Sequence, residues 1–128
     1  MLKLNRCFEG LKYSTWPARL QIIEEGKLVN IIDNKKRLIF LDGAHNLSGA
    51  KALKNTLSKI SSEWLIIFGY LKTRDPEEYL KTMIPISKNI ITTNISGSVE
   101  SFSPDELLKF SDSLGFSSYK SNNLLEAF

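Results

Sequence analysis

Residues that could contact a ligand gather directly after the apolar run at residues 37–41. The sequence there reads Asp42-Gly43-Ala44-His45-Asn46. In an open parallel sheet, ligands bind beyond the carboxyl ends of the strands, where the following helix also offers N–H groups and the positive end of its dipole. We expect the Asp42 carboxylate at a strand tip, where it can accept hydrogen bonds from a ribose diol. Gly43 and Ala44 would let a ligand approach the backbone, and His45 would face a phosphate bound there.

The same residues also admit a purely structural interpretation. Asp42 and Asn46 can cap the following helix, and His45 is then a half-exposed loop residue. A phosphate-binding P-loop is excluded because five residues, not four, separate Gly43 from Gly49. A hydrolase that uses Asp42 and His45 lacks a nucleophile with a partner base.

Basic side chains are expected at the same edge of the sheet. Lys72 and Arg74 follow the apolar run at residues 64–68 and would bring positive charge to that edge, although a solvated loop is the favoured explanation for them. Arg19 precedes the sheet. Its planar guanidinium offers the fork of donors that suits a phosphate.

The elements that must position these residues follow a β-α-β-α order. Short apolar runs lie at residues 37–41, 64–68, 89–93 and 116–119, and amphipathic stretches separate them. The first two runs lack polar alternation, so we expect strands that are buried on both faces, as a parallel sheet requires. The predicted fold class is therefore α/β, with a Rossmann-like, mostly parallel sheet flanked by helices.

Local signals mark where the helices begin and end. The first is expected from Asn46 to Ile60, because its apolar residues recur at three- and four-residue steps. The pairs Asp75-Pro76 and Ser103-Pro104 each combine an N-cap residue with a proline at the first helical position. Gly115 ends the third helix.

The first part of the chain is organised differently. We expect a β-hairpin with strands at residues 20–24 and 28–32, connected through Gly26. Residues 1–13 are interpreted as the tail of a preceding domain with a connector, and residues 14–128 as one domain.

Composition narrows the classes of function. The 128 residues are 42% hydrophobic and 24% charged, which is typical of one soluble domain. A single cysteine and a single histidine exclude an internal disulfide and a zinc site. The net charge of +3 is scattered among 14 acidic residues, which disfavours nucleic-acid binding. No apolar run approaches the ~20 residues of a membrane helix, and the N-terminus is too polar for a signal peptide. We expect a cytoplasmic protein with no membrane partner.

Three short segments stand in a distinctive order. They are Trp16-Pro17-Ala18-Arg19-Leu20-Gln21, Leu41-Asp42-Gly43-Ala44-His45-Asn46 and Ile67-Phe68-Gly69. Together they resemble the C-terminal domain of folylpolyglutamate and dihydrofolate synthases, which belong to the Mur ligase superfamily, and the resemblance covers nearly the whole chain. Gly43 favours the folate branch, because peptidoglycan ligases usually carry an aromatic residue there.

The resemblance implies a ligase that uses ATP and magnesium to turn a carboxylate into an acyl phosphate, which the amine of L-glutamate then attacks. The carboxylate would belong to a folate or to dihydropteroate. In that family, the arginine matching Arg19 contacts ATP phosphate and the aspartate matching Asp42 holds the ribose. His45 matches a histidine of the same nucleotide-facing motif. Arg19, Asp42 and His45 are therefore the predicted nucleotide-binding residues, and no catalytic or metal-binding residue is predicted in this chain.

The resemblance also places the P-loop, the magnesium ligands and most of the folate site in a preceding central domain. We therefore expect the chain to be inactive alone, either as a gene fragment or as one half of a split enzyme whose separate partner chain carries the P-loop domain. The sheet is expected to be truncated at its last strand, with marginal stability. Leu47 and Arg74 depart from the proline and lysine usual in the family. The alternative is a non-catalytic module that binds a nucleotide or a protein.

Overall fold

The computed structural model describes residues 17–32 and 37–128. The predicted tail at residues 1–13 and Trp16 lie outside the described residues. The strands are β1 (Gln21–Ile23), β2 (Ile39–Leu41), β3 (Leu65–Phe68), β4 (Asn89–Thr92) and β5 (Ser117–Lys120). The helices are α2 (Lys27–Ile31), α3 (Leu47–Leu57), α4 (Pro76–Met83) and α5 (Pro104–Ser113).

The centre of the molecule is a parallel sheet in the order β3-β4-β5. Ile66 of β3 pairs with Ile90 of the central strand, which in turn pairs with Ser118 of β5. Helix α4 connects β3 to β4, and α5 connects β4 to β5, so each parallel pair is joined by a helical crossover. The α/β class with a parallel, helix-flanked sheet is thereby confirmed.

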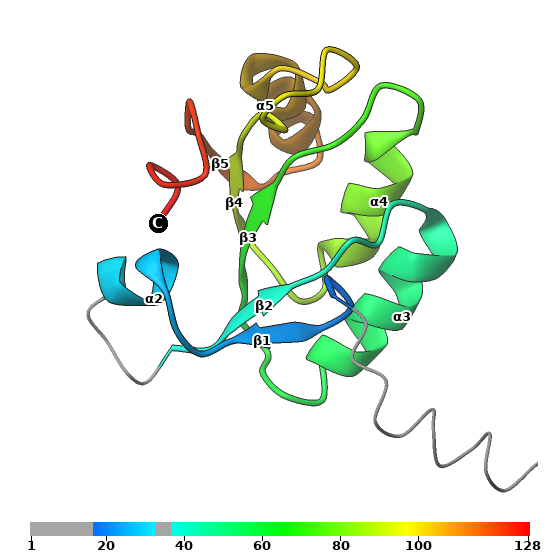
Figure 1. Ribbon diagram of the computed structural model, residues 1–128. Helices are drawn as coiled ribbons and strands as arrows, with labels where there is room; N and C mark the ends of the chain where they lie inside the picture. Colours follow the sequence, from blue (N-terminus) through cyan, green and yellow to red (C-terminus); the bar gives the residue numbers. More distant parts are fainter. Residues whose placement is uncertain (1–16, 33–36) are drawn as a thin grey trace, which may run out of the picture.

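The core lies between the sheet and the longer helices. Figure 1 shows α3 and α4 to the right of the three parallel strands and α5 above these strands. Ile90 of the central strand is fully buried, as are Leu80 of α4 and Leu107 of α5. The other core side chains, apart from Ala127 near the C-terminus, belong to the same cluster: Ala50, Leu53, Leu57, Phe68, Tyr70, Tyr79, Met83, Ile86 and Phe116.

The predicted helix starts are confirmed. The Asn46 side chain accepts a hydrogen bond from the Gly49 N–H at the start of α3, and Asp75 caps α4 in the same way. Ser103 and Glu106 form a reciprocal capping box at the start of α5. The end of the first helix was placed too late, because α3 ends at Leu57.

The predicted hairpin is wrong. Residues 28–32 do not form a strand, because α2 begins after Gly26, whose φ of 104° leaves the extended region. Leu28 and Ile31 are three residues apart, so one turn of helix brings them to the same side of the chain. Strand β1 pairs instead with β2 in an antiparallel, two-stranded sheet, in which Ile22 lies opposite Phe40.

The expectation that residues 37–41 form a doubly buried parallel strand is therefore also wrong. Strand β2 pairs antiparallel, and Leu38 and Leu41 remain 59% and 47% exposed. The run at residues 64–68 does enter the parallel sheet. However, β3 is an edge strand there, and Leu65 is 55% exposed while Phe68 is buried. Among the described residues, no helix is long and apolar enough to cross a membrane.

Candidate functional site

The candidate site is built on the loop that follows β2. Both carboxylate oxygens of Asp42 accept backbone hydrogen bonds: Oδ2 from the Leu20 N–H at 2.8 Å and Oδ1 from the Ala44 N–H at 2.7 Å. The first bond crosses to a segment 22 residues earlier in the chain, and the second closes the loop on itself. The carboxylate therefore joins two segments that the sequence analysis treated separately.

The second segment carries Arg19. The Gly43 N–H donates to the Ala18 carbonyl at 2.6 Å, so residues 18–20 lie directly against the loop after β2. Ala18 and Leu20 have φ values of 57° and 47°, in the left-handed region. That conformation costs about 1–2 kcal/mol for a residue with a side chain, and non-glycine residues held there cluster at functional sites. The structure thus brings the Arg19 backbone beside Asp42.

His45 lies in the same loop and is exposed. Its Nδ1 is 2.9 Å from the Gly43 carbonyl oxygen. Because a carbonyl can only accept, Nδ1 must carry the proton of this bond, and the neutral ring then has Nε2 as an acceptor. A neutral His45 suits a hydroxyl or amino donor. A phosphate oxygen would require the doubly protonated ring.

Tyr70, which follows β3, supports this loop from the side of the parallel sheet. The Tyr70 hydroxyl donates to the His45 carbonyl at 2.8 Å, and the Tyr70 ring stacks on Phe68 with centroids 5.1 Å apart. Tyr79 of α4 packs against both rings. Burial raises the pKa of Tyr79 far above its ordinary value, and the nearby Asp42 carboxylate raises it further. Burial also raises the pKa of Tyr70. Both phenols therefore stay neutral and keep their protons.

Neither tyrosine was predicted as part of the site. Tyr70 follows Gly69 directly after the apolar run of β3, which is a signal that could have marked it as a residue at the carboxyl edge of the sheet. Tyr79 gave no such signal, because an aromatic residue on the core face of a helix is ordinary packing.

The basic residues after β3 are only partly oriented towards the site. Lys72 forms an ion pair with Glu106 at 3.0 Å, with both side chains about half exposed. Its ammonium also lies 5.8 Å from the centroid of the Phe102 ring. Arg74 is close enough to Tyr70 to lower the pKa of that phenol against the effect of burial. Lys72 is thus engaged with Glu106 of α5, whereas Arg74 acts electrostatically on Tyr70.

Within the part of the chain that the structure describes, the side chains of the candidate site form no assembled catalytic group. Asp42 bonds to backbone N–H groups and His45 bonds to a carbonyl, so these two side chains do not orient one another. Asn46 caps α3, as the structural interpretation of the motif required. Within residues 17–32 and 37–128, no three His, Cys, Asp or Glu side chains cluster closely enough to hold a metal ion.

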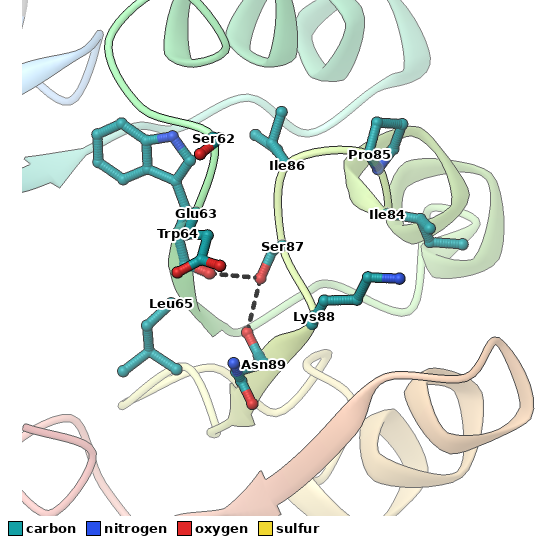
Figure 2. Close-up of a pocket in the computed structure, with 10 residues that line it drawn as sticks. All are labelled: Ser62, Glu63, Trp64, Leu65, Ile84, Pro85, Ile86, Ser87, Lys88 and Asn89. Atoms are coloured by element: carbon teal, nitrogen blue, oxygen red, sulfur yellow. Dashed lines mark hydrogen bonds between the residues drawn. The ribbon is translucent and has the colours of Figure 1, made fainter.

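A separate hollow of about 410 Å³ lies at the opposite edge of the sheet (Figure 2). It is lined by residues 62–65 and 84–89, where β3 and β4 begin. The Ser87 hydroxyl at its centre faces two carbonyls, those of Trp64 at 2.7 Å and Asn89 at 2.8 Å. Because these acceptors hold the hydroxyl, the hollow offers no activated nucleophile.

Comparison with known proteins gives matches among solved structures alone. The chain is similar to Mycobacterium tuberculosis folylpolyglutamate synthase complexed with ADP, with a TM-score of 0.75 and 24% identity over 92% of this chain. For Thermotoga maritima folylpolyglutamate synthase, the TM-score is 0.72 and the identity 25% over 93% of this chain. For the bifunctional folylpolyglutamate synthase/dihydrofolate synthase of Yersinia pestis, the TM-score is 0.70 and the identity 21% over 93% of this chain. No protein-family model and no curated protein sequence matches.

The resemblance drawn from the three motifs is thereby confirmed at the level of the fold. The match covers 25% of the M. tuberculosis chain, 26% of the T. maritima chain and 25% of the Y. pestis chain. This chain therefore spans about a quarter of the length of the synthases that it resembles.

Proposed function

We propose that this chain is the nucleotide-facing, C-terminal domain of an ATP-dependent ligase of the folylpolyglutamate/dihydrofolate synthase type. Such a ligase adds L-glutamate to a folate or dihydropteroate carboxylate through an acyl phosphate. One observation carries the proposal: the loop at residues 18–20 and the loop at residues 42–45 are hydrogen-bonded into one unit, in a chain whose fold matches a synthase complexed with ADP.

Each residue of this unit has a role that its chemistry permits. Arg19 binds phosphate, where a guanidinium can offset the charge of the transferring group. Asp42 holds the ribose. A carboxylate has about four lone-pair positions, and the two backbone bonds use one on each oxygen, so capacity for a diol remains. His45 contacts the nucleotide through Nε2.

The nucleotide would supply the phosphoryl group, and the residues of this chain would bind and orient it. The site does not fit a magnesium ion by itself, because no three metal-binding side chains cluster in the described part of the chain. By the resemblance to the synthases, we assign the magnesium ligands and the P-loop to a separate domain, and we do not expect the isolated chain to catalyse ligation.

The second candidate is a non-catalytic module that binds a nucleotide or another protein. It is favoured by the way in which the two loops are joined, because the bonds from the Leu20 N–H to Asp42 and from the Gly43 N–H to Ala18 are both formed within this chain. A site that is organised without a second domain can retain measurable affinity for the nucleotide on its own.

Titration calorimetry with magnesium-ATP tests the proposed site. We expect weak, saturable binding by the chain, and a loss of about tenfold or more in Arg19→Ala and Asp42→Ala, since bonds to charged groups contribute about 1.5–3 kcal/mol. Asp112→Ala is the matched control, because Asp112 is exposed near the end of α5. It should bind as the unaltered chain does. Equal binding by all four proteins would contradict the proposed site.

A further inference from the structure

The Asp42 carboxylate bridges the two halves of the site. Oδ1 is satisfied within its own loop by the Ala44 N–H, whereas Oδ2 reaches the Leu20 N–H. A second bond runs parallel to this one, from the Gly43 N–H to the Ala18 carbonyl. The two bonds that cross between the loops therefore end on the residues immediately before and after Arg19.

Those two residues are the ones in the left-handed conformation. Ala18 and Leu20 have side chains and would leave this region unless surrounding contacts held them there. The Gly43 bond restrains the peptide on one side of Arg19, and the Asp42 bond restrains the peptide on the other. The direction in which the Arg19 side chain leaves the backbone thus depends on the Asp42 carboxylate.

We propose that Asp42 is a positioning residue that fixes the backbone at Arg19. Phosphate recognition by this chain then depends on Asp42 even when the ligand has no ribose. This inference rests on the proposed function in one respect, because Arg19 is taken to be the phosphate ligand. The positioning role and a ribose contact predict different effects of replacing Asp42. Loss of a pure ribose contact would weaken only ligands that carry the diol.

Inorganic tripolyphosphate distinguishes the two roles, because it has the phosphates of ATP without the sugar. Binding of tripolyphosphate and of ADP would be measured by calorimetry for the chain, Asp42→Ala and Asp42→Asn. We expect Asp42→Ala to weaken both ligands by about tenfold, a loss typical of a bond to a charged group. Asp42→Asn retains a single oxygen acceptor, so its loss should be smaller. Weakening of ADP alone would overturn the proposal.

A double-mutant cycle tests whether Asp42 acts through Arg19. Residues that act on one contact give strongly non-additive effects. We expect Asp42→Ala to cause no further loss of tripolyphosphate affinity once Arg19→Ala is present. Additive losses would mean that Asp42 contacts the ligand independently, and would overturn the proposal. Asp112→Ala serves again as the charge-matched control.

Amide hydrogen exchange tests, without any ligand, whether the Asp42 carboxylate restrains the backbone around Arg19. The Leu20 amide donates to the Asp42 carboxylate and should exchange about tenfold faster or more in Asp42→Ala, because a lost bond to a charged group is of that size. The Gly43 amide donates to the Ala18 carbonyl and should also lose protection when the Asp42 bond no longer holds the two loops together. The amides of β4, the central strand, report whether the fold is intact and should be unchanged. Unchanged protection at Leu20 would overturn the proposal. If the unaltered chain binds neither ligand, the proposed function fails. The exchange result alone then decides whether Asp42 fixes the backbone at Arg19.

Discussion

The Asp42 carboxylate accepts one backbone hydrogen bond from its own loop and one from the segment that carries Arg19. The sequence placed a carboxylate near a strand tip, which is correct, because Asp42 directly follows β2. It could not reveal that both oxygens accept backbone N–H groups, one of them from a residue 22 positions earlier. That bond depends on the approach of two loops that are distant in sequence, and no local pattern records it.

Removing the Tyr70 hydroxyl tests how much this group stabilises the loop that carries His45. Tyr70→Phe deletes the hydroxyl that donates to the His45 carbonyl and keeps the stacked ring. We expect a loss of about 1 kcal/mol in the free energy of unfolding, which is typical of one hydrogen bond. Tyr119→Phe is the matched control, since Tyr119 is 60% exposed, and it should change stability by less than about 0.5 kcal/mol. Urea unfolding measures both variants, and equal values would contradict the role of Tyr70.

At the scale of the elements, α5 shows how local chemistry makes a helix start predictable. Ser103 and Glu106 are three residues apart, which is the spacing of a capping box, and the structure contains both reciprocal bonds. Hydrogen bonds from the Ser103 backbone and from Lys72 lower the pKa of Glu106 to about 2, from an ordinary value of 4.5.

This shift predicts how stability depends on pH. The folded-state pKa of Glu106 is depressed, so its contribution is fully present above pH 4.5 and is lost as the pH falls towards 2. We expect Glu106→Gln to reduce the fall in melting temperature over this range. Glu78→Gln is the control, because Glu78 holds the corresponding third position of α4, where Asp75 caps without a reciprocal box. An unchanged pH profile in Glu106→Gln would contradict the assignment.

Helix caps were predictable from the sequence, whereas the pairing of β1 was not. Caps involve residues two to four positions apart, and they were predicted correctly at Asn46, Asp75 and Ser103. The hairpin failed because the apolar residues at 28–32 fit a strand by composition and a helical turn by spacing. The true partner of β1 is β2, and this pairing is selected by tertiary contacts.

At the scale of the whole molecule, the order of strands and helices was sufficient to predict an α/β fold with a parallel sheet. The structure confirms that class, and solved synthases share it over about nine-tenths of the chain. The separate β1-β2 sheet was not predicted, because an apolar run of five residues does not reveal whether the strand pairs parallel or antiparallel. The proposed function rests on the two joined loops as well as on the fold, because a fold alone does not imply a function.

Mapping the binding of magnesium-ADP by NMR tests the central claim most directly. The amide resonances of the chain would be followed during titration, which detects weak binding and locates it. We expect shifts concentrated at residues 18–20 and 42–46, with little change at residues 62–65 and 84–89 around the opposite hollow. Shifts centred on that hollow, or none at saturating nucleotide in the folded chain, would contradict the claim that these loops form a nucleotide site.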